Sequence, residues 1–453
     1  AFEEMFLIHL AALKRKREWQ KKSLAHQLFI NQEKILEIIA SLPFELTGAQ
    51  KRSVREILAD LANNQPMNRL LEGEVGSGKT VVATIAMYAV FLNGLQSALM
   101  APTEVLATQH YQTIKNLLGP YGVKIELLTG SRKKISQFDI LIGTHALIHK
   151  YAKFENLSLA IIDEQHRFGV EHRAKLIKKG EAPHILTMTA TPIPRTIVLT
   201  LYGNLDLSII DEMPPGRLKV KTWVVPPQKR KAGYRWIEGQ IKSLKVQAFI
   251  VCPLIEESEK EKMKDVKAAT VEYERLKGIF SNLKLGLLHG RLKAKEKEEV
   301  IKKFKNGSLD ILVSTPVVEV GIDIPKATIM MIEGADRFGL AQLHQLRGRV
   351  GRRNLASYCF LFTETHSSKI FKRLKYLEKI NVGMKLAEYD LKLRGPGELL
   401  GTKQHGFPDL RVASFTNLDL IKKTRKATEG IIDELKNYPL LKKKLKNYII
   451  EIN

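Results

Sequence analysis

The chain has 453 residues, 44% of them hydrophobic, and its 73 Lys and Arg outnumber its 48 Asp and Glu to give a formal net charge of +25. That length exceeds one ordinary core and suggests about three domains, while the hydrophobic content excludes a disordered basic tail. The charge favours a polyanionic partner, nucleic acid before membrane, because basic residues are spread along the chain. A solvated Lys-rich surface is the alternative that charge leaves open.

The two cysteines, Cys252 and Cys359, lie in separate apolar stretches without a second cysteine nearby. This excludes a disulfide framework and a zinc ribbon, so a reducing cytoplasm is the expected compartment. The 12 histidines show no metal-ligand spacing, and we assign no zinc. The longest strongly apolar run, 81–92, is about half of a bilayer span, so no membrane partner is expected.

Residues 1–41 are predicted to be helical, because Phe2, Phe6, Leu10 and Leu13 recur at helical spacing. The chain begins inside this pattern, so we expect a linker from a missing upstream domain. The apolar face of such a helix must pack on the domain that follows or on that upstream part.

Residues 42–215 alternate short apolar strands with amphipathic helices, which predicts a parallel sheet covered by helices on both faces. Ligands of such sheets bind at the carboxyl ends of the strands. The predicted strands are 68–71, 96–100, 124–128, 139–142, 157–162 and 185–189.

A phosphate-binding loop, GEVGSGKT, follows the first predicted strand. Its glycines let backbone N–H groups point at phosphates, and the helix beginning near Lys79 adds its positive dipole end. Lys79 is expected to reach the β- and γ-phosphates and Thr80 to hold magnesium. A plain glycine turn is the alternative, which the strand and helix context disfavours. The loop residues expected to bind nucleotide are Gly73, Gly76, Ser77, Gly78, Lys79 and Thr80.

An acidic pair, Asp163 and Glu164, ends the fifth predicted strand in the sequence IIDEQH. ATP hydrolysis needs magnesium on the phosphates and a group that positions the attacking water. Asp163 suits the metal and Glu164 suits the water. Acidic pairs at strand ends are commonly turn residues, but this pair follows an intact phosphate loop, which favours a catalytic role.

The proline-rich turn 213–216 marks the expected boundary to a second series of strands and helices in residues 216–365. This series has no phosphate loop of its own, so the two sheets are expected to share one nucleotide site at their junction. Its predicted strands are 248–253, 285–289, 310–314, 328–332 and 358–362.

The segment QLHQLRGRVGR, residues 342–352, is predicted to lie on one helix. Gln345, Arg349 and Arg352 would then share a face. Guanidinium groups presented together suit a γ-phosphate in the transition state. A basic, solvated helix is the alternative.

Hydroxyl groups, glycines and basic residues recur at the predicted strand ends of both series. Such groups contact nucleic-acid phosphates without reading bases, so the predicted binding is independent of sequence and salt-sensitive. Each position is a weak signal by itself. The candidates are Pro102, Thr103, Thr129, Gly130, Gly143, Thr144, His289, Gly290, Arg291, Ser314 and Thr315.

Residues 366–453 are predicted to be helical, with a sharp turn at 394–397 and a Lys-rich tail from residue 417. These residues are expected to form a C-terminal helical hairpin and further helices.

From Leu42 onward the motifs resemble superfamily 2 helicases: GEVGSGKT looks like motif I, APTEVL Ia, DEQH II, TATPIPR III, STPVVEVGID V and QLRGRVGR VI. The order and spacing of DEQHRFGV, LDLSIIDEMPPGR, VCPLIEESE and ADRFGLAQLHQLRGRVGR are similar to the RecG family of bacterial fork-remodelling translocases. DLKLRGPGELLGTKQHG resembles the hairpin by which that family couples ATP hydrolysis to movement on duplex DNA. DEQH and HGRL depart from the forms expected of the related Mfd family.

The resemblance implies an α/β fold of two RecA-like lobes that bind ATP and Mg²⁺. It implies adenine recognition by Gln50, stacking by Phe44, and nucleotide contacts from the second lobe by Gly321 and Asp323. The residues that it implies for DNA binding and coupling are Gln165, His166, Thr189, Thr191, Arg394 and Gln404.

The resemblance further implies a double-stranded DNA translocase that remodels stalled forks and Holliday junctions. We expect a monomer, with single-stranded DNA-binding protein as a further partner. The RecG family carries an upstream wedge domain that nothing here resembles, so motor function is better supported than fork specificity. An RNA helicase and a nucleotide-gated, non-hydrolysing DNA scaffold remain as alternatives, although an inert scaffold would be expected to lose some catalytic residues.

Overall fold

The computed structural model describes residues 1–21, 27–192, 194, 197, 200, 205–216, 218–253, 262–316, 324–351, 355–365, 367–394, 413 and 417–451. The chain folds into two compact units. The first comprises Ala1–Gly73, Ser77–Glu212 and Ala387–Asn453, and the second comprises Glu74–Gly76 and Met213–Leu386.

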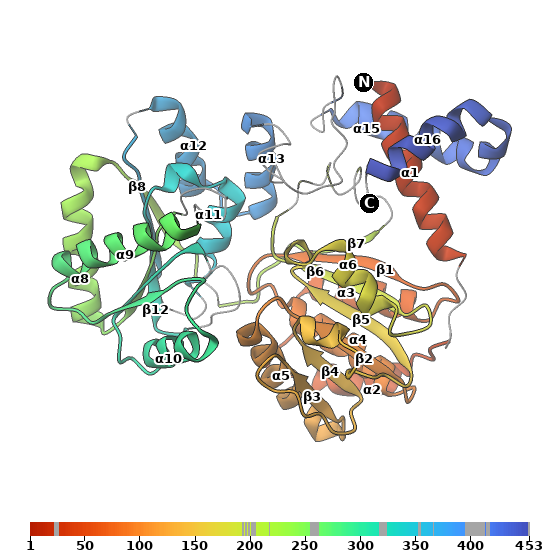
Figure 1. Ribbon diagram of the computed structural model, residues 1–453, viewed down its shortest axis with the longest axis horizontal. Coiled ribbons are helices and arrows are strands. Elements are labelled where there is room, and N and C mark those ends of the chain that lie inside the picture. The colour runs from red at the N-terminus through yellow and green to blue at the C-terminus, as the bar shows by residue number, and fades with distance from the viewer. Residues whose placement is uncertain are drawn as a thin grey trace. The chain divides into compact units, whose positions relative to one another are not determined.

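The first unit is built on a parallel sheet with the strand order β3-β4-β2-β5-β6-β1-β7 (Figure 1). Its strands are β1 (Asn68–Gly73), β2 (Gln96–Met100), β3 (Ile125–Leu128), β4 (Ile140–Gly143), β5 (Leu157–Asp163), β6 (His184–Thr189) and β7 (Asp206–Ile210). The helices of this part are α2 (Gln32–Ala40), α3 (Gly48–Leu61), α4 (Lys79–Phe91), α5 (Glu104–Leu118) and α6 (Val170–Ile177), with the short 3-10 helices η1 (Gly119–Tyr121), η2 (His145–Ile148) and η3 (Gln165–Arg167).

Helix α4 is buried along almost its whole length, from Val81 to Val90. A helix that is apolar on every side belongs in the interior of a domain rather than on its surface. Helices α3 and α5 pack against it, and it also contacts β1 and β2. The apolar run after the phosphate loop is therefore a core helix.

Helices from both ends of the chain pack together in the first unit: α1 (Phe2–Gln20), α15 (Leu418–Ile431), η7 (Ile432–Asn437) and α16 (Pro439–Glu451) (Figure 1). Their shared core includes Phe6, Leu10, Ile432 and Leu445. Helix α1 also contacts the sheet-bearing part, because Lys16 pairs with Asp206 at 2.7 Å. The apolar face of the first helix is thus covered by the C-terminal helices.

The second unit contains a parallel sheet with the order β10-β11-β9-β12-β13-β8. Its strands are β8 (Lys221–Val225), β9 (Gln247–Val251), β10 (Leu285–Leu288), β11 (Ile311–Ser314), β12 (Ala327–Ile332) and β13 (Tyr358–Phe362). Its described helices are α8 (Arg230–Leu244), α9 (Lys262–Ile279), α10 (Ala294–Lys305), α11 (Leu340–Arg347) and α12 (Ser368–Lys379), with the 3-10 helices η4 (Pro227–Lys229) and η6 (Ala335–Arg337). Helix α13 (Gly383–Arg394) begins in the second unit and continues in the first.

Successive residues of a central strand serve two separate cores in this unit. In β9, Phe249 and Val251 join one core, whereas Ala248 and Ile250 join the other. This alternation follows from the period of two along a strand. Both faces of the sheet are therefore buried beneath helices, and the predicted α/β fold with two parallel sheets is confirmed.

Each strand predicted from an apolar run is present, with bounds that shift by at most two residues at either end. Among the described residues, two strands were not predicted: β7 and β8, each at the edge of its sheet. An edge strand is less buried than a central one, so it can carry polar side chains. These two strands contain Asp206, Ser208, Lys221 and Thr222, and their sequences therefore lack a continuous apolar run. The predicted domain boundaries after residues 41, 215 and 365 stay predictions.

Among the described helices, none combines the length and apolar character that a membrane span requires.

Candidate nucleotide and nucleic-acid site

The strands of the first sheet all run in one direction, so the segments that follow them leave at one edge. β1, β5 and β6 lead into the phosphate loop, the acidic pair and the TAT segment (Thr189, Ala190 and Thr191), and the sheet order places these three strands side by side. β3, β4 and β2 precede the expected DNA-contact residues and form the other half. The boundary between the two halves is the pair β2 and β5.

The phosphate loop leaves β1 at Gly73 and enters α4 at Lys79. Gly78 has φ 90° and is the N-cap of α4, a left-handed conformation that favours glycine. A Cβ atom on Gly73 would lie 2.5 Å from Ser77 Oγ, so this turn also requires glycine. Lys79 Nζ donates a hydrogen bond of 2.7 Å to the Gly73 carbonyl, which places the ammonium over the loop.

Gln50 is buried and ties the start of α3 to this loop. Its Oε1 accepts a hydrogen bond from Thr47 N at 2.9 Å, and its Nε2 donates to the Ser77 carbonyl at 2.8 Å. Phe44 is half exposed. Adenine recognition by Gln50 and stacking by Phe44 stay predictions.

The acidic pair lies at the end of β5, and both side chains are buried. Glu164 has φ 50°, a strained conformation for a residue with a side chain. Its Oε2 accepts a hydrogen bond from Ala190 N at 3.2 Å and lies 3.5 Å from Thr189 Oγ1. Thr189 Oγ1 in turn accepts from Thr191 N at 3.1 Å. The Glu164 carboxylate is thus held against the TAT segment.

Asp163 is bound by a residue that the sequence reasoning did not single out, His110 on α5. His110 Nε2 lies 2.8 Å from Asp163 Oδ2, and both side chains are buried. Burial alone would raise the pKa of the Asp163 carboxyl, but the hydrogen bond from His110 and the charge of Lys79 outweigh it and lower that pKa. Asp163 is therefore ionised, as a magnesium ligand must be.

A signal for His110 exists in the sequence. Leu106, His110 and Ile114 recur at intervals of four and form the buried face of α5. A histidine on an apolar helix face at this position is buried, which distinguishes it from a surface histidine. What it faces could not be read from the chain.

Two expected DNA-contact residues of the first unit, Thr103 and Thr129, make hydrogen bonds within the protein. Thr103 caps α5 by accepting from Leu106 N at 3.2 Å. Glu104, the first residue of α5, accepts from Ser131 N and from Ser131 Oγ, both at 3.1 Å. Thr129 Oγ1 lies 3.0 Å from Ser131 Oγ. The loops after β2 and β3 are therefore joined to each other.

In the second unit, Arg291 is exposed after β10, whereas the side chains of Ser314 and Thr315 are buried at the end of β11. The structure thus offers the Arg291 guanidinium to solvent but not these two hydroxyl groups. Their assignment as phosphate contacts stays a prediction.

The prediction that 342–352 forms one helix is wrong. Helix α11 ends at Arg347 with Gly348 as its C-cap, and Gly351 has φ 75°. Glycines at this spacing end the helix, so Arg349 lies beyond it and does not share a helical face with Gln345. Both side chains are buried.

Arg347, the last residue of α11, has a structural role. It is buried, donates to the carbonyls of Leu377 and Ile380 at 2.7 and 3.2 Å, and contacts His344 Nδ1 at 2.7 Å. Burial lowers the pKa of its guanidinium. These bonds join the end of α11 to the end of α12.

Several predicted site residues cannot be placed. Arg352, Gly321, Asp323 and Gln404 lie outside the described residues, and so do the side chains of His166 and Arg394. Gln165 is buried and accepts a hydrogen bond from Arg173 at 3.4 Å.

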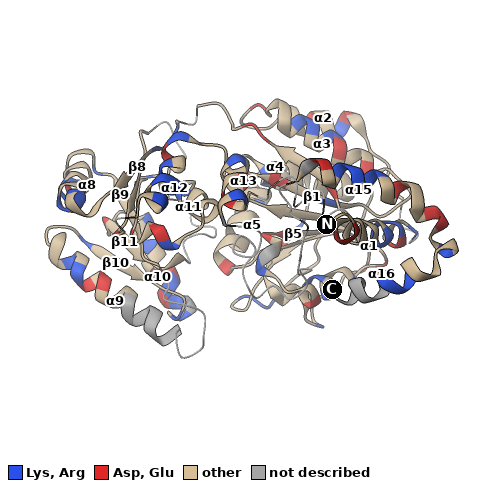
Figure 2. Ribbon diagram, turned by 90° about the horizontal axis from the view of Figure 1, so that it is seen from above, with Lys and Arg blue, Asp and Glu red and all other residues tan. Residues whose placement is uncertain are grey.

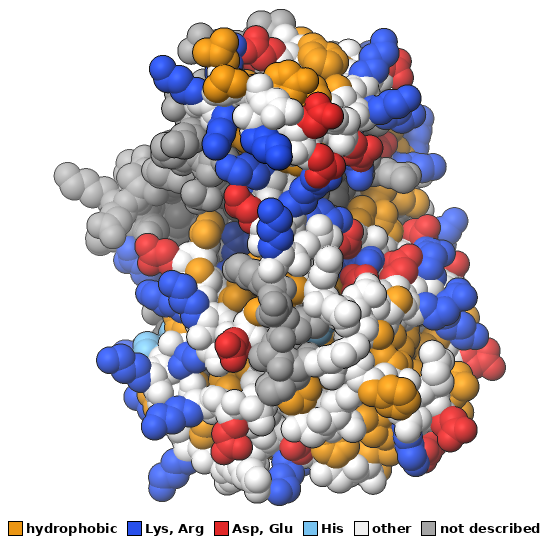
Figure 3. Space-filling model, turned by 90° about the vertical axis from the view of Figure 1, so that its right-hand side faces the viewer, with side chains coloured by type: hydrophobic (Ala, Val, Ile, Leu, Met, Phe, Trp, Pro, Cys, Tyr) orange, Lys and Arg blue, Asp and Glu red, His pale blue; other side chains and the backbone are white. Residues whose placement is uncertain are grey.

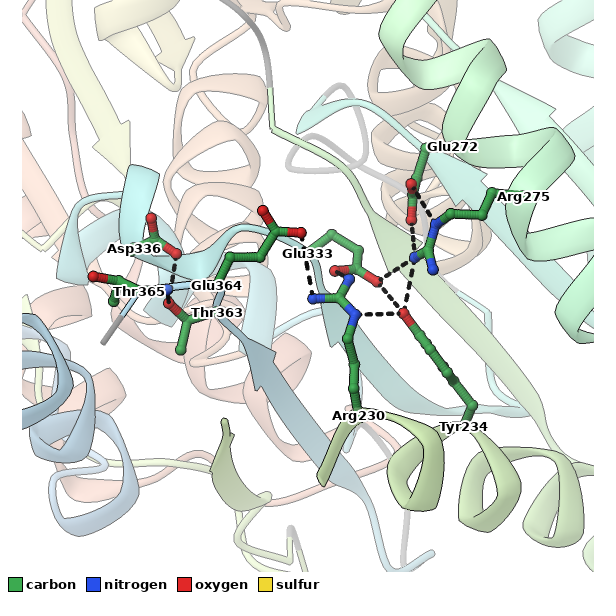
Figure 4. Close-up of polar contacts among 9 residues, drawn as sticks. All are labelled: Arg230, Tyr234, Glu272, Arg275, Glu333, Asp336, Thr363, Glu364 and Thr365. Atoms are coloured by element: carbon green, nitrogen blue, oxygen red, sulfur yellow. Dashed lines mark hydrogen bonds and ion pairs between the residues drawn. The ribbon is translucent and has the colours of Figure 1, made fainter. Parts of the chain in front are cut away.

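A polar cluster lies beyond the carboxyl ends of β12 and β13 (Figure 4). Glu333 is buried there and is paired with Arg230 and with Arg275, the latter at 3.2 Å, while Tyr234 Oη donates to it at 2.8 Å. Burial raises the pKa of Glu333, and burial together with the Glu333 charge raises the pKa of Tyr234 to about 12. Glu272 also pairs with Arg275, and Glu364 pairs with Arg230 at 3.8 Å. Because these carboxylates compensate the two guanidinium groups, the cluster joins α8 and α9 to the strand ends rather than attracting an anion.

Basic side chains are distributed over both units. Lys and Arg occur along most of the labelled helices in Figure 2. On the face shown in Figure 3 they are interspersed with Asp and Glu. Positive charge alone therefore does not mark the path of a nucleic acid on that face.

Three family profiles match successive parts of the chain. Residues 47–199 match the DEAD/DEAH box helicase family, residues 236–354 match the helicase conserved C-terminal domain, and residues 367–448 match the C-terminal domain 3 of ATP-dependent DNA helicase RecG.

Curated relatives include the ATP-dependent DNA helicase RecG of Synechocystis sp., which is 48% identical over 461 residues that cover 98% of this chain and 55% of that protein. The Thermotoga maritima protein of the same name is 47% identical over 444 residues, covering 95% of this chain and 56% of that protein. The chain therefore spans just over half the length of these relatives.

Among solved structures, RecG bound to a three-way DNA junction matches with a TM-score of 0.79 and 43% identity, covering 95% of this chain and 56% of that chain. S. cerevisiae Dbp5 bound to RNA and ADP BeF3 matches with a TM-score of 0.58 and 18% identity, covering 82% and 98%. The second match shows a shared fold alone.

Proposed function

Because the chain belongs to the RecG family, we propose that it is the motor core of an ATP-dependent DNA helicase that moves on duplex DNA and remodels branched DNA. The observation that carries this proposal is the buried acidic pair beside the phosphate loop. The positive charge of Lys79 helps to lower the pKa of Asp163 and so keeps it ionised, and Glu164 is hydrogen-bonded to the TAT segment. A chain that only bound nucleotide would not need this arrangement.

The phosphate loop and Lys79 bind the triphosphate of ATP in this proposal. Thr80 and Asp163 offer a hydroxyl and a carboxylate, the hard oxygen donors that magnesium prefers, and magnesium held there would neutralise charge on the phosphates. Glu164 orients the water that attacks the γ-phosphorus as the bond to the ADP oxygen breaks. Its bond to the TAT segment fixes the direction of that carboxylate.

Arg349 and Arg352 are proposed to bind the γ-phosphate from the second lobe, and Gly321 and Asp323 to contact the nucleotide. Guanidinium groups suit the charge that spreads over the γ-phosphate oxygens. ATP would then join the two lobes, and its hydrolysis would release them, which converts a chemical step into movement.

Branched DNA is proposed as the substrate because a 43% identical relative has been solved with a three-way DNA junction. The exposed Arg291 and the polar residues after β2, β3 and β4 support contacts to the phosphate backbone. Stalled replication forks and Holliday junctions are the branched forms proposed. Arg394 and Gln404 are proposed to belong to the element that couples hydrolysis to translocation.

The test is ATP hydrolysis by the chain alone, with linear duplex DNA, with forked DNA and with duplex RNA. We expect DNA to stimulate hydrolysis more than RNA does. Lys79→Ala and Glu164→Gln should each reduce the DNA-stimulated rate by about a hundredfold or more, because each removes a group that acts in the transition state. Gln112→Ala, an exposed change on α5, is the matched control.

Stronger stimulation by RNA would support the RNA-helicase alternative. Hydrolysis that survives both substitutions would contradict the site assignment. Absence of hydrolysis by the unaltered chain, with DNA binding retained, would support the scaffold alternative.

The finer assignments are Mg²⁺ as the metal, a monomer, a cytoplasmic location and single-stranded DNA-binding protein as a partner. The free, buried Cys252 and Cys359 support a reducing compartment. Loss of hydrolysis on chelation and its recovery with Mg²⁺ test the metal. Light scattering tests the monomer, and a binding titration tests the protein partner.

A further inference from the structure

Helix α5 connects two parts of the first unit that the proposed function keeps separate. Its N-cap, Thr103, lies among the expected DNA contacts, whereas His110 on the same helix bonds the expected magnesium ligand Asp163. His110 lies seven positions after Thr103, a rise of about 10 Å along a helix. A short, rigid element therefore reaches from one site to the other.

The bond at the Asp163 end fixes both partners. A carboxylate can only accept, so His110 Nε2 carries the proton and donates to Asp163 Oδ2 at 2.8 Å. A hydrogen bond to one carboxylate oxygen restricts rotation of the group and so sets where its other oxygen can meet a metal or its water. Groups that orient metal ligands in this way commonly change metal affinity or activity by about 10- to 100-fold when they are removed.

The start of α5 is also hydrogen-bonded to the neighbouring loop, there at exposed positions. Glu104 accepts two hydrogen bonds from Ser131, and Ser131 Oγ contacts Thr129. A Cβ atom on Gly130 would lie 3.0 Å from Glu104 Oε1, so the loop packs closely on the helix. A phosphate that displaces Thr129 or Thr103 would therefore displace α5 with it.

We propose that His110 is a positioning residue through which DNA binding at the loops after β2 and β3 orients Asp163 for nucleotide binding. This inference rests on the proposed function and adds a route for coupling within one lobe. It differs from a purely structural role of His110, which would affect the site equally with and without DNA.

The test uses an equilibrium that does not depend on hydrolysis. The affinity of the chain for a fluorescent, non-hydrolysable ATP analogue with Mg²⁺ is measured with and without duplex DNA. The ratio of the two affinities is the coupling factor, which typically lies at about 5- to 150-fold in coupled systems. The same factor must appear when DNA affinity is measured with and without the analogue.

We expect His110→Leu, which fills similar space without a donor, to bring this factor to about one-fold. His110→Gln can place an amide N–H near the position of Nε2 and should retain most of the factor. Ser131→Ala weakens the other end of the route and should reduce the factor as well. Because His110→Leu and Ser131→Ala act on one route, the variant that combines them should lose no more of the coupling factor than His110→Leu alone. Gln112→Ala on the exposed face of α5 should match the unaltered chain.

Coupling in His110→Leu equal to that of the unaltered chain would overturn the inference, and so would equal loss in His110→Gln and His110→Leu. An unfolded His110→Leu variant, detected by its melting curve, leaves His110→Gln and Ser131→Ala to decide: loss with Ser131→Ala supports the route, and retention overturns it. If the unaltered chain binds no DNA or no nucleotide, the proposed function fails. If it binds and couples both while the variants match it, only this inference fails.

Discussion

Gly73 shows how closely the phosphate loop depends on single atoms. A methyl group at this position would meet Ser77 Oγ at 2.5 Å and Ile210 Cβ at 3.1 Å. We expect Gly73→Ala to weaken binding of a fluorescent ATP analogue at least tenfold, because the loop must shift to admit the methyl group.

Gly239 on α8 provides the control, since no atom lies within 4 Å of the position that its Cβ would take. Gly239→Ala should leave nucleotide binding unchanged and stabilise the fold by about 0.5–1 kcal/mol. Nucleotide binding by Gly73→Ala equal to that of the unaltered chain would show that the loop is looser than described.

The burial of His184 leads us to expect that the stability of the fold depends on pH. It is fully buried, burial lowers its pKa to about 4, and its Nδ1 accepts a hydrogen bond from Met67 N at 3.0 Å. The unfolded histidine titrates near 6.5, so between about pH 6.5 and 4 the unfolded chain binds the extra proton. Stability contributed by neutral His184 is therefore present above this window and is lost as pH falls through it.

Lowering the pH from 7 to 5 should cost about 1–2 kcal/mol of folding free energy through His184. His184→Asn keeps an acceptor near Met67 N without titrating and should show a smaller fall in melting temperature over the same range. Equal falls in the two proteins would contradict this assignment.

The elements show what could be read from the chain and what could not. Apolar runs identified the central strands, since strands buried on both faces are apolar throughout. The edge strands β7 and β8 were missed because Asp206 and Lys221 interrupt that signal. The end of α11 was not predicted, because the helical spacing of Gln345, Arg349 and Arg352 was given more weight than the tendency of Gly348 to end a helix. The contact of His110 with Asp163 depends on β2 lying beside β5, an order that tertiary packing decides.

The helix α1 offers an element-scale prediction. Leu10 is fully buried against Ile432 and Leu445 from the C-terminal helices. We expect Leu10→Ala to lower the stability of α15 and α16 by about 2–4 kcal/mol, because it leaves a cavity. Hydrogen exchange of the amides in α15 and α16 measures this loss directly.

Leu440→Ala on α16 is the control, since Leu440 is 78% exposed. In this control, the free energy of opening measured by exchange of the α15 and α16 amides should lie within about 0.5 kcal/mol of that of the unaltered chain. If Leu10→Ala leaves the exchange of α15 unchanged, the first helix does not support the C-terminal helices.

At the scale of the whole molecule, each unit holds part of one proposed machine. The first carries Lys79, Asp163 and Glu164, and the second carries Arg349. Neither unit is proposed to move on DNA alone, because the proposal assigns groups from both units to the triphosphate. The central claim is that hydrolysis of ATP drives the chain along double-stranded DNA.

Displacement of a third strand from a DNA triplex tests that claim most directly. The unaltered chain should displace the third strand with ATP and Mg²⁺ but not with a non-hydrolysable analogue, and Glu164→Gln should bind the duplex without displacing it. Displacement that proceeds equally with the analogue, or duplex-stimulated hydrolysis by the unaltered chain without any displacement, would contradict the account.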